Sequence, residues 1–364
     1  MADNAGSVGG DRIEDLFPGP ARPSRPARHR RMVMNFWTVS IGSFMVFASV
    51  VAMVVALPML SYNPPPSQRA RPLTPLEARG RELYAANGCW YCHSQTNRPQ
   101  DVSPTGLTTV RGNIPSQAGD YAYVFNALLG SERTGPDLAM EGGVHTDDWQ
   151  LAHFKNPRNT EPESLMPRFS WLSTTDLQAL IAYVQSLGGK DADARVAAQR
   201  DRTAALLGQK PLTNPQAIAY VQDQTQWSKT TVNPLPVNES VLVEGKKIFF
   251  THCIGCHGVK GDGGGPASQF LTIKPFNFTS TIGAAANSPG LRYFAILNGR
   301  LGTAMPAWGN RLTVEEIWAV EWFLRTIPNC GAEQVPTTAM VVPPGYKGPP
   351  GACDTTQQPQ KTGG

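Results

Sequence analysis

The chain has 364 residues, enough for two compact domains and additional segments. Only 16% of its residues are charged, whereas 35 glycines and 32 prolines favour loop-rich domains and connectors over long regular bundles. The formal net charge of +4 is small and is not gathered into a basic patch, which excludes the usual signature of a nucleic-acid-binding protein.

The first predicted element is a membrane anchor. Residues 1–31, rich in Pro, Ala and Arg, are predicted to be a disordered tail. No charged residue occurs from Val33 to Leu60, a stretch of 28 residues that is long enough to cross a bilayer and too long for a signal-peptide core. We therefore expect an uncleaved anchor over residues 32–62, with the helix ending near Pro58; a cleaved signal peptide is the alternative.

The arginines around this anchor predict its orientation. Five of them crowd its N-terminal side, but only Arg69 and Arg71 lie just beyond it. By the positive-inside rule, the N-terminus is cytoplasmic and everything after Tyr62 is outside. In a bacterium this means a single-pass protein of the inner membrane with its main domains in the oxidising periplasm.

Two short motifs indicate the chemistry. Cys-x-x-Cys-His occurs at residues 89–93 and again at residues 253–257. A redox dithiol would need only Cys-x-x-Cys, usually after a strand, and a zinc site would need two such pairs close together. The pairs here are 164 residues apart and each has its own histidine, so the pattern favours two covalently bound haem c groups. The predicted thioether residues are Cys89, Cys92, Cys253 and Cys256, and the predicted proximal ligands are His93 and His257.

The sixth iron ligand is predicted to be a methionine in each half. Among the methionines after the anchor, only Met166 and Met305 are followed by proline, and each precedes an amphipathic helical pattern. Core packing is the alternative role for either methionine, and His153 is the rival ligand to Met166. His145 and His252 are expected at the surface. The helices after the methionines are expected to be capped by Thr174 or Thr175 and by Thr313.

A second recurrence precedes each motif. "ARGRELYAANGC" and "VEGKKIFFTHC" share a glycine followed by an aliphatic and an aromatic residue, with the glycines at Gly80 and Gly245. We expect an N-terminal helix in each half to cross the C-terminal helix there, because glycine permits a close backbone approach. Each half therefore has the order helix, Cys-x-x-Cys-His, loop, Met-Pro, helix.

This order resembles class I cytochromes c, twice over. The resemblance implies an all-α chain: one N-terminal transmembrane helix followed by two class I cytochrome c domains. It also implies that a proline carbonyl holds each proximal histidine, and Pro136 and Pro266 match that position. The glycine run at residues 263–265 is then expected to form a tight turn beside the cofactor rather than a phosphate loop.

The first half carries a more specific resemblance. "GCWYCHSQTNRPQ", "AGDYAYVFNALLGSERTGPDLAMEGG" and "TDDWQLAHFKNPRNTEPESLMPRFSWL" resemble the mono-haem, FixO-like subunit of cbb3-type cytochrome oxidases, whereas the second half resembles small mono-haem cytochromes of respiratory complexes. The stretch "DVSPTGLTTVRGNIP" departs from the FixO-like pattern. The expected regions are a FixO-like domain at 63–189, a linker with a helix at 190–235, a second cytochrome domain at 236–329 and a low-complexity tail at 330–364.

The resemblance implies a function in electron transfer. We expect a non-catalytic dihaem subunit that passes electrons from a soluble cytochrome or a quinol-oxidising complex to the catalytic subunit of a haem–copper oxidase. The alternatives are an electron-transfer subunit of nitric oxide reductase, of alternative complex III or of a periplasmic dehydrogenase, and further a dihaem peroxidase or a haem-based gas sensor. Either of the last two would need an iron with an open position.

Two cysteines remain outside the motifs. Cys330 and Cys353 are an even pair near the C-terminus, and in the periplasm they could form a disulfide. Such a bond would close a loop of roughly 24 residues and stabilise the fold by about 3 kcal/mol in the chain-entropy model. Two free or lipid-modified thiols are the alternative, since spacing alone does not determine pairing.

Overall fold

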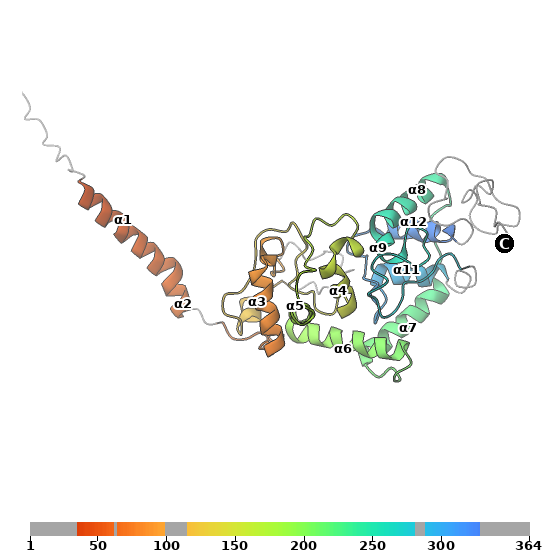
Figure 1. The fold of residues 1–364 in the computed structure, drawn as a ribbon, viewed down its shortest axis with the longest axis horizontal. Helices are drawn as coiled ribbons and strands as arrows, with labels where there is room; N and C mark the ends of the chain where they lie inside the picture. The colour runs from red at the N-terminus through yellow and green to blue at the C-terminus, as the bar shows by residue number, and fades with distance from the viewer. Residues whose placement is uncertain (1–34, 62–63, 99–114, 281–287, 328–364) are drawn as a thin grey trace, which may run out of the picture. The chain divides into compact units, whose positions relative to one another are not determined.

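The computed structural model describes residues 35–61, 64–98, 115–280 and 288–327. Within these ranges every regular element is helical and there is no strand, which confirms the all-α prediction. The chain divides into two units, residues 1–63 and the remainder from Pro64 onward (Figure 1). The two terminal tails, including Cys330 and Cys353, lie outside the described residues, so their predicted disulfide stays a prediction.

The first unit holds the apolar helix. It runs without interruption from Phe36 to Ser61 as α1 (Phe36–Val51), the π-helical turn η2 (Ala52–Ala56) and α2 (Leu57–Ser61). Asn35 caps its start by accepting from the backbone N–H of Thr38. The helix continues past Pro58, contrary to the expected end. Proline has no backbone N–H to donate, and the wide π turn just before it lets the helix continue without that hydrogen bond. Its 26 residues are long and apolar enough to span a membrane.

The first half of the unit after Asn63 is built on two crossing helices. α3 begins at Thr74, whose hydroxyl and Glu77 form a capping box, and α5 begins at Ser173, which caps it in place of the expected Thr174 or Thr175. Leu177, Leu180 and Val184 form the buried face of α5. The elements in chain order are α3 (Pro75–Ala86), η3 (Cys89–Tyr91), η5 (Ala118–Tyr121), α4 (Asp147–Lys155), η6 (Pro157–Asn159) and α5 (Thr174–Ser186).

The second half of this unit repeats this plan. Thr313 caps α12 with a capping box to Glu316, as expected. Ile317, Val320 and Leu324 of α12 pack against α8 and α11. The elements are α8 (Glu239–Ile248), η7 (Phe249–Cys253), α9 (Ile254–His257), α11 (Pro289–Asn298) and α12 (Val314–Leu324).

Both predicted glycine contacts occur. A Cβ added to Gly80 would lie 2.6 Å from the carbonyl carbon of Ala179, and one added to Gly245 would lie 2.7 Å from the carbonyl carbon of Ala319. α3 therefore packs on α5, and α8 on α12, at a distance that only glycine allows. This confirms the predicted internal repeat.

The region between the domains is more ordered than the predicted linker. It forms α6 (Gly189–Leu206) and α7 (Pro215–Thr230), and both pack on the domains. The Arg195 guanidinium of α6 donates to two backbone carbonyls of the first domain, those of Met140 and Gly142. Trp227 of α7 stacks on Tyr293 of α11, with ring centroids 5.7 Å apart. From Pro64 onward the described residues thus form one compact unit.

Candidate haem sites

The first candidate site begins where α3 ends. Gly88 adopts a left-handed conformation with φ of 71°, which turns the chain into the short helix that carries Cys89. Cys89 packs against the core of this domain and Cys92 is exposed. Burial raises the pKa of the Cys89 thiol to about 11, so its sulfur is uncharged in the unmodified chain. Cys89 and Cys92 thus stand on one turn, which places His93 directly after it.

The orientation of His93 depends on a backbone carbonyl. Its Nδ1 lies 2.8 Å from the carbonyl oxygen of Pro136, the residue that the sequence resemblance assigned to this contact. A carbonyl can only accept, so Nδ1 carries the proton and Nε2 presents a lone pair. Gly135 lies against the ring, since an added Cβ would be 2.7 Å from both ring nitrogens. The histidine therefore has the tautomer that an iron ligand needs.

Two distal candidates converge in the first domain. Met166 packs in the same cluster as Cys89, and Nε2 of His153 lies 3.2 Å from its sulfur. The Thr160 hydroxyl donates to the Pro157 carbonyl at 3.1 Å, so it accepts from Nδ1–H of His153 at 2.7 Å. This leaves a lone pair on Nε2, and burial lowers the pKa of His153 to about 3, which keeps the ring neutral.

This pair fits a metal centre. The Met166 sulfur has no proton to donate, and Nε2 of His153 has none in this tautomer, so two acceptors face each other. A cation that takes either lone pair removes that conflict. The donor set of His93 with a thioether or a second imidazole matches the ligation of haem iron.

The second candidate site follows α8 through the π turn η7 into α9. Burial raises the pKa of Cys253 and Cys256 to about 12 and lowers that of His257 to about 4, so all three side chains are uncharged. The backbone N–H groups of Gly263 and Gly265 donate to the carbonyls of His257 and Cys256, at 2.8 and 3.2 Å. The glycine run is therefore a tight turn beside the motif, as expected.

The carbonyl on His257 differs from the expected one. Nδ1 of His257 lies 3.1 Å from the carbonyl oxygen of Phe276, whereas the Pro266 carbonyl accepts from the amide of Gln269. The long loop after α9 brings residues 275–278 back over the histidine, and this return is a tertiary feature that the local Gly-Pro pattern does not encode. The consequence for His257 is nevertheless the same, since Nδ1 is protonated and Nε2 is free to ligate.

A cavity of about 200 Å³ lies at this second site. Cys253, Cys256, His257 and Met305 all line it, and most of the remaining wall is apolar. The backbone N–H of Arg300 donates to the Met305 carbonyl at 3.0 Å, which holds the methionine loop. Two thiols, an imidazole and a thioether around one apolar cavity fit a covalently held haem.

Comparisons with known protein families found a match in each half of the chain. Residues 29–179 match the family model "Cytochrome C oxidase, mono-heme subunit/FixO", and residues 241–324 match "Cytochrome C oxidase, cbb3-type, subunit III". Each half of the chain thus matches a family of cbb3-type oxidase subunits. The search of curated proteins found no match.

Among solved structures, the chain is similar to the reducing HAO-like protein complex of Kuenenia stuttgartiensis. The identity is 21%, and the match covers 50% of this chain and 72% of that chain. Its TM-score is 0.23, so the similarity carries no argument about fold or function.

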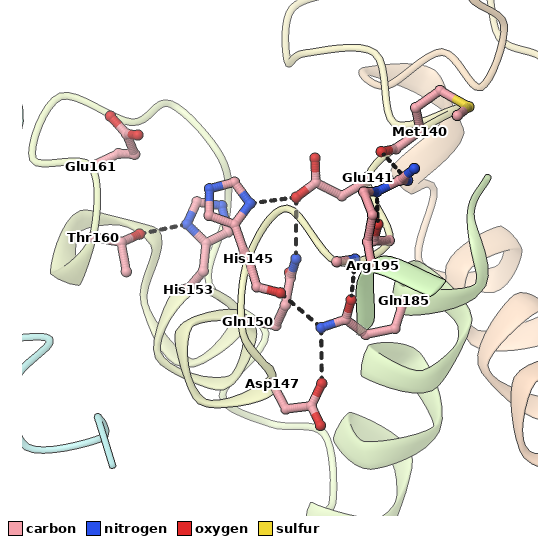
Figure 2. Close-up of polar contacts among 12 residues, drawn as sticks. Met140, Glu141, His145, Asp147, Gln150, His153, Thr160, Glu161, Gln185 and Arg195 are labelled. Carbon is pink, nitrogen blue, oxygen red and sulfur yellow. Dashed lines mark hydrogen bonds and ion pairs between the residues drawn. The ribbon is translucent and has the colours of Figure 1, made fainter. Parts of the chain in front are cut away.

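Two histidines of the matched regions are not the surface residues expected. His145 has a side chain only 11% exposed and contacts the buried carboxylate of Glu141 (Figure 2). Its ring also stacks on that of Trp149. Gln150 also donates to Glu141, at 3.4 Å. His252 is half-buried, lines the second cavity and lies 5.1 Å from the Trp308 ring. Tertiary packing, and not local polarity, decides both positions.

Sequence reasoning also missed three residues that build the sites. Phe276 supplies the carbonyl to His257, while Trp149 and Thr160 both touch His153 and line the second cavity. The only local signal was that Trp149 stands four residues before His153, a spacing that brings two side chains together on a helix. Nothing in the sequence indicated that the same residues reach the second site.

Proposed function

We propose that the chain is a dihaem c-type cytochrome that relays electrons to the catalytic subunit of a cbb3-type oxidase. The observation that carries the proposal is the repeated set of two cysteines, a histidine with its Nδ1 bound to a carbonyl, and a methionine that packs in the same cluster or cavity as the cysteines. The two family matches, one to each half, support the same function. Cys89, Cys92 and His93 would hold one haem with Met166, and Cys253, Cys256 and His257 would hold the other with Met305.

Such sites suit electron transfer rather than bond chemistry. A haem held here would take a histidine and a methionine of the chain as its iron ligands, and the methionine would raise its reduction potential. The haem supplies the one-electron redox change when bound, whereas the chain holds it, excludes water and keeps Nε2 of each proximal histidine unprotonated. We infer no catalytic activity for the chain alone.

The domains have separate partners in this proposal. The FixO-like domain follows the membrane helix and delivers electrons to the haem–copper subunit in the membrane. The second domain receives them from a soluble cytochrome or a quinol-oxidising complex. The tail before the membrane helix is cytoplasmic and both haem domains are periplasmic, in keeping with the arginine distribution.

The number of haems is tested directly. Full-length protein purified in mild detergent should give a pyridine haemochrome ratio of two per chain, and the haem should resist extraction by acidified acetone. The control replaces Cys253 and Cys256 with serine, which should lower the ratio to one. A wild-type ratio near one, or extractable haem, contradicts the proposal.

The partner is tested by what co-purifies. Mass spectrometry of the complex isolated in mild detergent should identify a haem–copper oxidase subunit. Recovery of subunits of nitric oxide reductase, alternative complex III or a dehydrogenase would assign the same electron-transfer chemistry to another complex. Peroxide turnover by the purified protein would show instead that one iron is open.

A further inference from the structure

The second cavity is incomplete without the first domain. Trp149, Thr160 and Glu161 of the first domain line it together with Cys253, Cys256 and Met305 of the second. Leu206, from the end of α6, also contributes. The wall nearest the first domain is thus made of residues that belong to another haem-binding half.

Trp149 is shared by the two sites. It is 7% exposed and forms one buried cluster with Ala152, Ala267, Leu271 and Ala304, against which Cys256 packs. Its ring stacks on that of His153, with centroids 4.6 Å apart and an interplanar angle of 11°. Because His153 contacts the Met166 sulfur, one indole connects the distal side of the first site to the thioether side of the second.

Thr160 makes a second connection between the same sites. Its hydroxyl accepts from Nδ1–H of His153 at 2.7 Å (Figure 2), and the residue also lines the second cavity. Directly behind it the backbone of Gly255, inside the second motif, packs on first-domain carbonyls. A Cβ on Gly255 would lie 2.6 Å from the carbonyl oxygen of Asn159 and 2.8 Å from that of Thr160.

The contact between the domains is held at several points around this junction. The carboxylate of Asp148 accepts from the backbone N–H of Thr272 at 2.7 Å, and Arg311 forms an ion pair with Glu161 at 2.7 Å. The Thr203 hydroxyl of α6 is 2.8 Å from the Gly302 carbonyl. With apolar residues at its centre, the junction is a packed interior rather than a transient contact.

We propose that the two haem sites exchange electrons directly through this junction and that Trp149 is the coupling residue, supported by Thr160. The proposal rests on the proposed dihaem function. The step is a one-electron exchange: one site is oxidised as the other is reduced, and no bond forms or breaks. Continuous packing between two redox sites speeds such an exchange, whereas a gap slows it. Trp149 also positions His153, so it influences the redox properties of both sites.

The test uses full-length protein in detergent with both haems bound. Rapid one-electron reduction followed by absorption spectroscopy gives the rate at which the two sites equilibrate. Trp149→Phe should slow this rate about threefold, because the smaller ring leaves part of the gap open, and Trp149→Leu about tenfold, equivalent to about 1.4 kcal/mol in the barrier. Trp171→Leu is the matched control, since Trp171 is 65% exposed, and should leave the rate unchanged.

Midpoint potentials provide a readout that a purely structural role would not move. Trp149→Leu should shift the midpoint potentials of both haems. Thr160→Val should shift the potential of the first haem, because it removes the hydroxyl that accepts from His153. Thr160→Ser keeps that hydroxyl and should leave the potential of the first haem at its wild-type value. Wild-type equilibration rates in the Trp149 variants overturn the proposal; if the Leu variant does not fold, the Phe variant decides. A wild-type haem ratio of one would instead refute the dihaem function itself.

Discussion

Replacing Gly245 with alanine should destabilise the second cytochrome domain. The added Cβ would lie 2.7 Å from the carbonyl carbon of Ala319 and 2.9 Å from Cβ of Phe323, whereas ordinary contact begins at 3.4 Å. α8 and α12 would therefore have to separate by at least about 0.7 Å, the difference between 3.4 and 2.7 Å. One of the atoms in the way is backbone, so no side-chain rotation relieves the overlap.

Two effects oppose each other in this substitution. Alanine is favoured over glycine inside a helix by about 1 kcal/mol. Overpacking a buried contact costs about 1–3 kcal/mol and more where the backbone must move. Because the overlap is with backbone, we take the upper part of that range and expect a net loss of about 2 kcal/mol in the free energy of unfolding.

The assay is thermal or denaturant unfolding of the full-length protein, followed by far-ultraviolet circular dichroism. The matched control is Gly42→Ala in α1, where an added Cβ meets nothing within 4 Å and only helix propensity changes. α12 contributes Val320 and Leu324 to the wall of the second cavity, so Gly245→Ala should also alter the spectrum of that haem. A Gly245→Ala protein as stable as wild type would refute the close-crossing argument.

Three further predictions concern ligands, buried charge and the junction. Met305→Ala should retain its haem, have a lower reduction potential and bind carbon monoxide. In Met166→Ala, His153 lies close enough to take the vacant position at the iron, so carbon monoxide should bind only when His153 is also replaced. Binding of carbon monoxide to the Met166→Ala single mutant would exclude His153 as a ligand. Glu321, fully buried, accepts from Arg292 and Arg325 at 3.1 and 2.7 Å, so Glu321→Ala should cost about 3–5 kcal/mol in denaturant unfolding because it removes a buried carboxylate that both guanidinium groups contact, and a loss under 1 kcal/mol would contradict this. Gly255→Ala should push the domains apart at the Thr160 carbonyl and expose the α6–α7 connection to limited proteolysis, whereas an unchanged cleavage pattern would show that the loop adapts.

The sequence alone determined the parts of this protein that depend on local spacing. Cys-x-x-Cys-His places two thiols and an imidazole on one turn whatever surrounds them, and the apolar run after the arginine-rich tail predicts a membrane span from length alone. The glycines Gly80 and Gly245 could be assigned to helix crossings because their patterns recur, and the structure places both at backbone contacts. Those inferences needed only neighbours along the chain.

Contacts between segments far apart in the chain were decided by the tertiary structure. The carbonyl that orients His257 comes from Phe276 rather than Pro266, because a long loop returns over the ring. Apart from its four-residue spacing to His153, no sequence pattern singled out Trp149, and packing of the second domain on α4 places it in the wall of the second cavity. Helix patterns specify which face is buried but not which other segment covers it, so the junction between the haem sites became visible only when both domains were folded together.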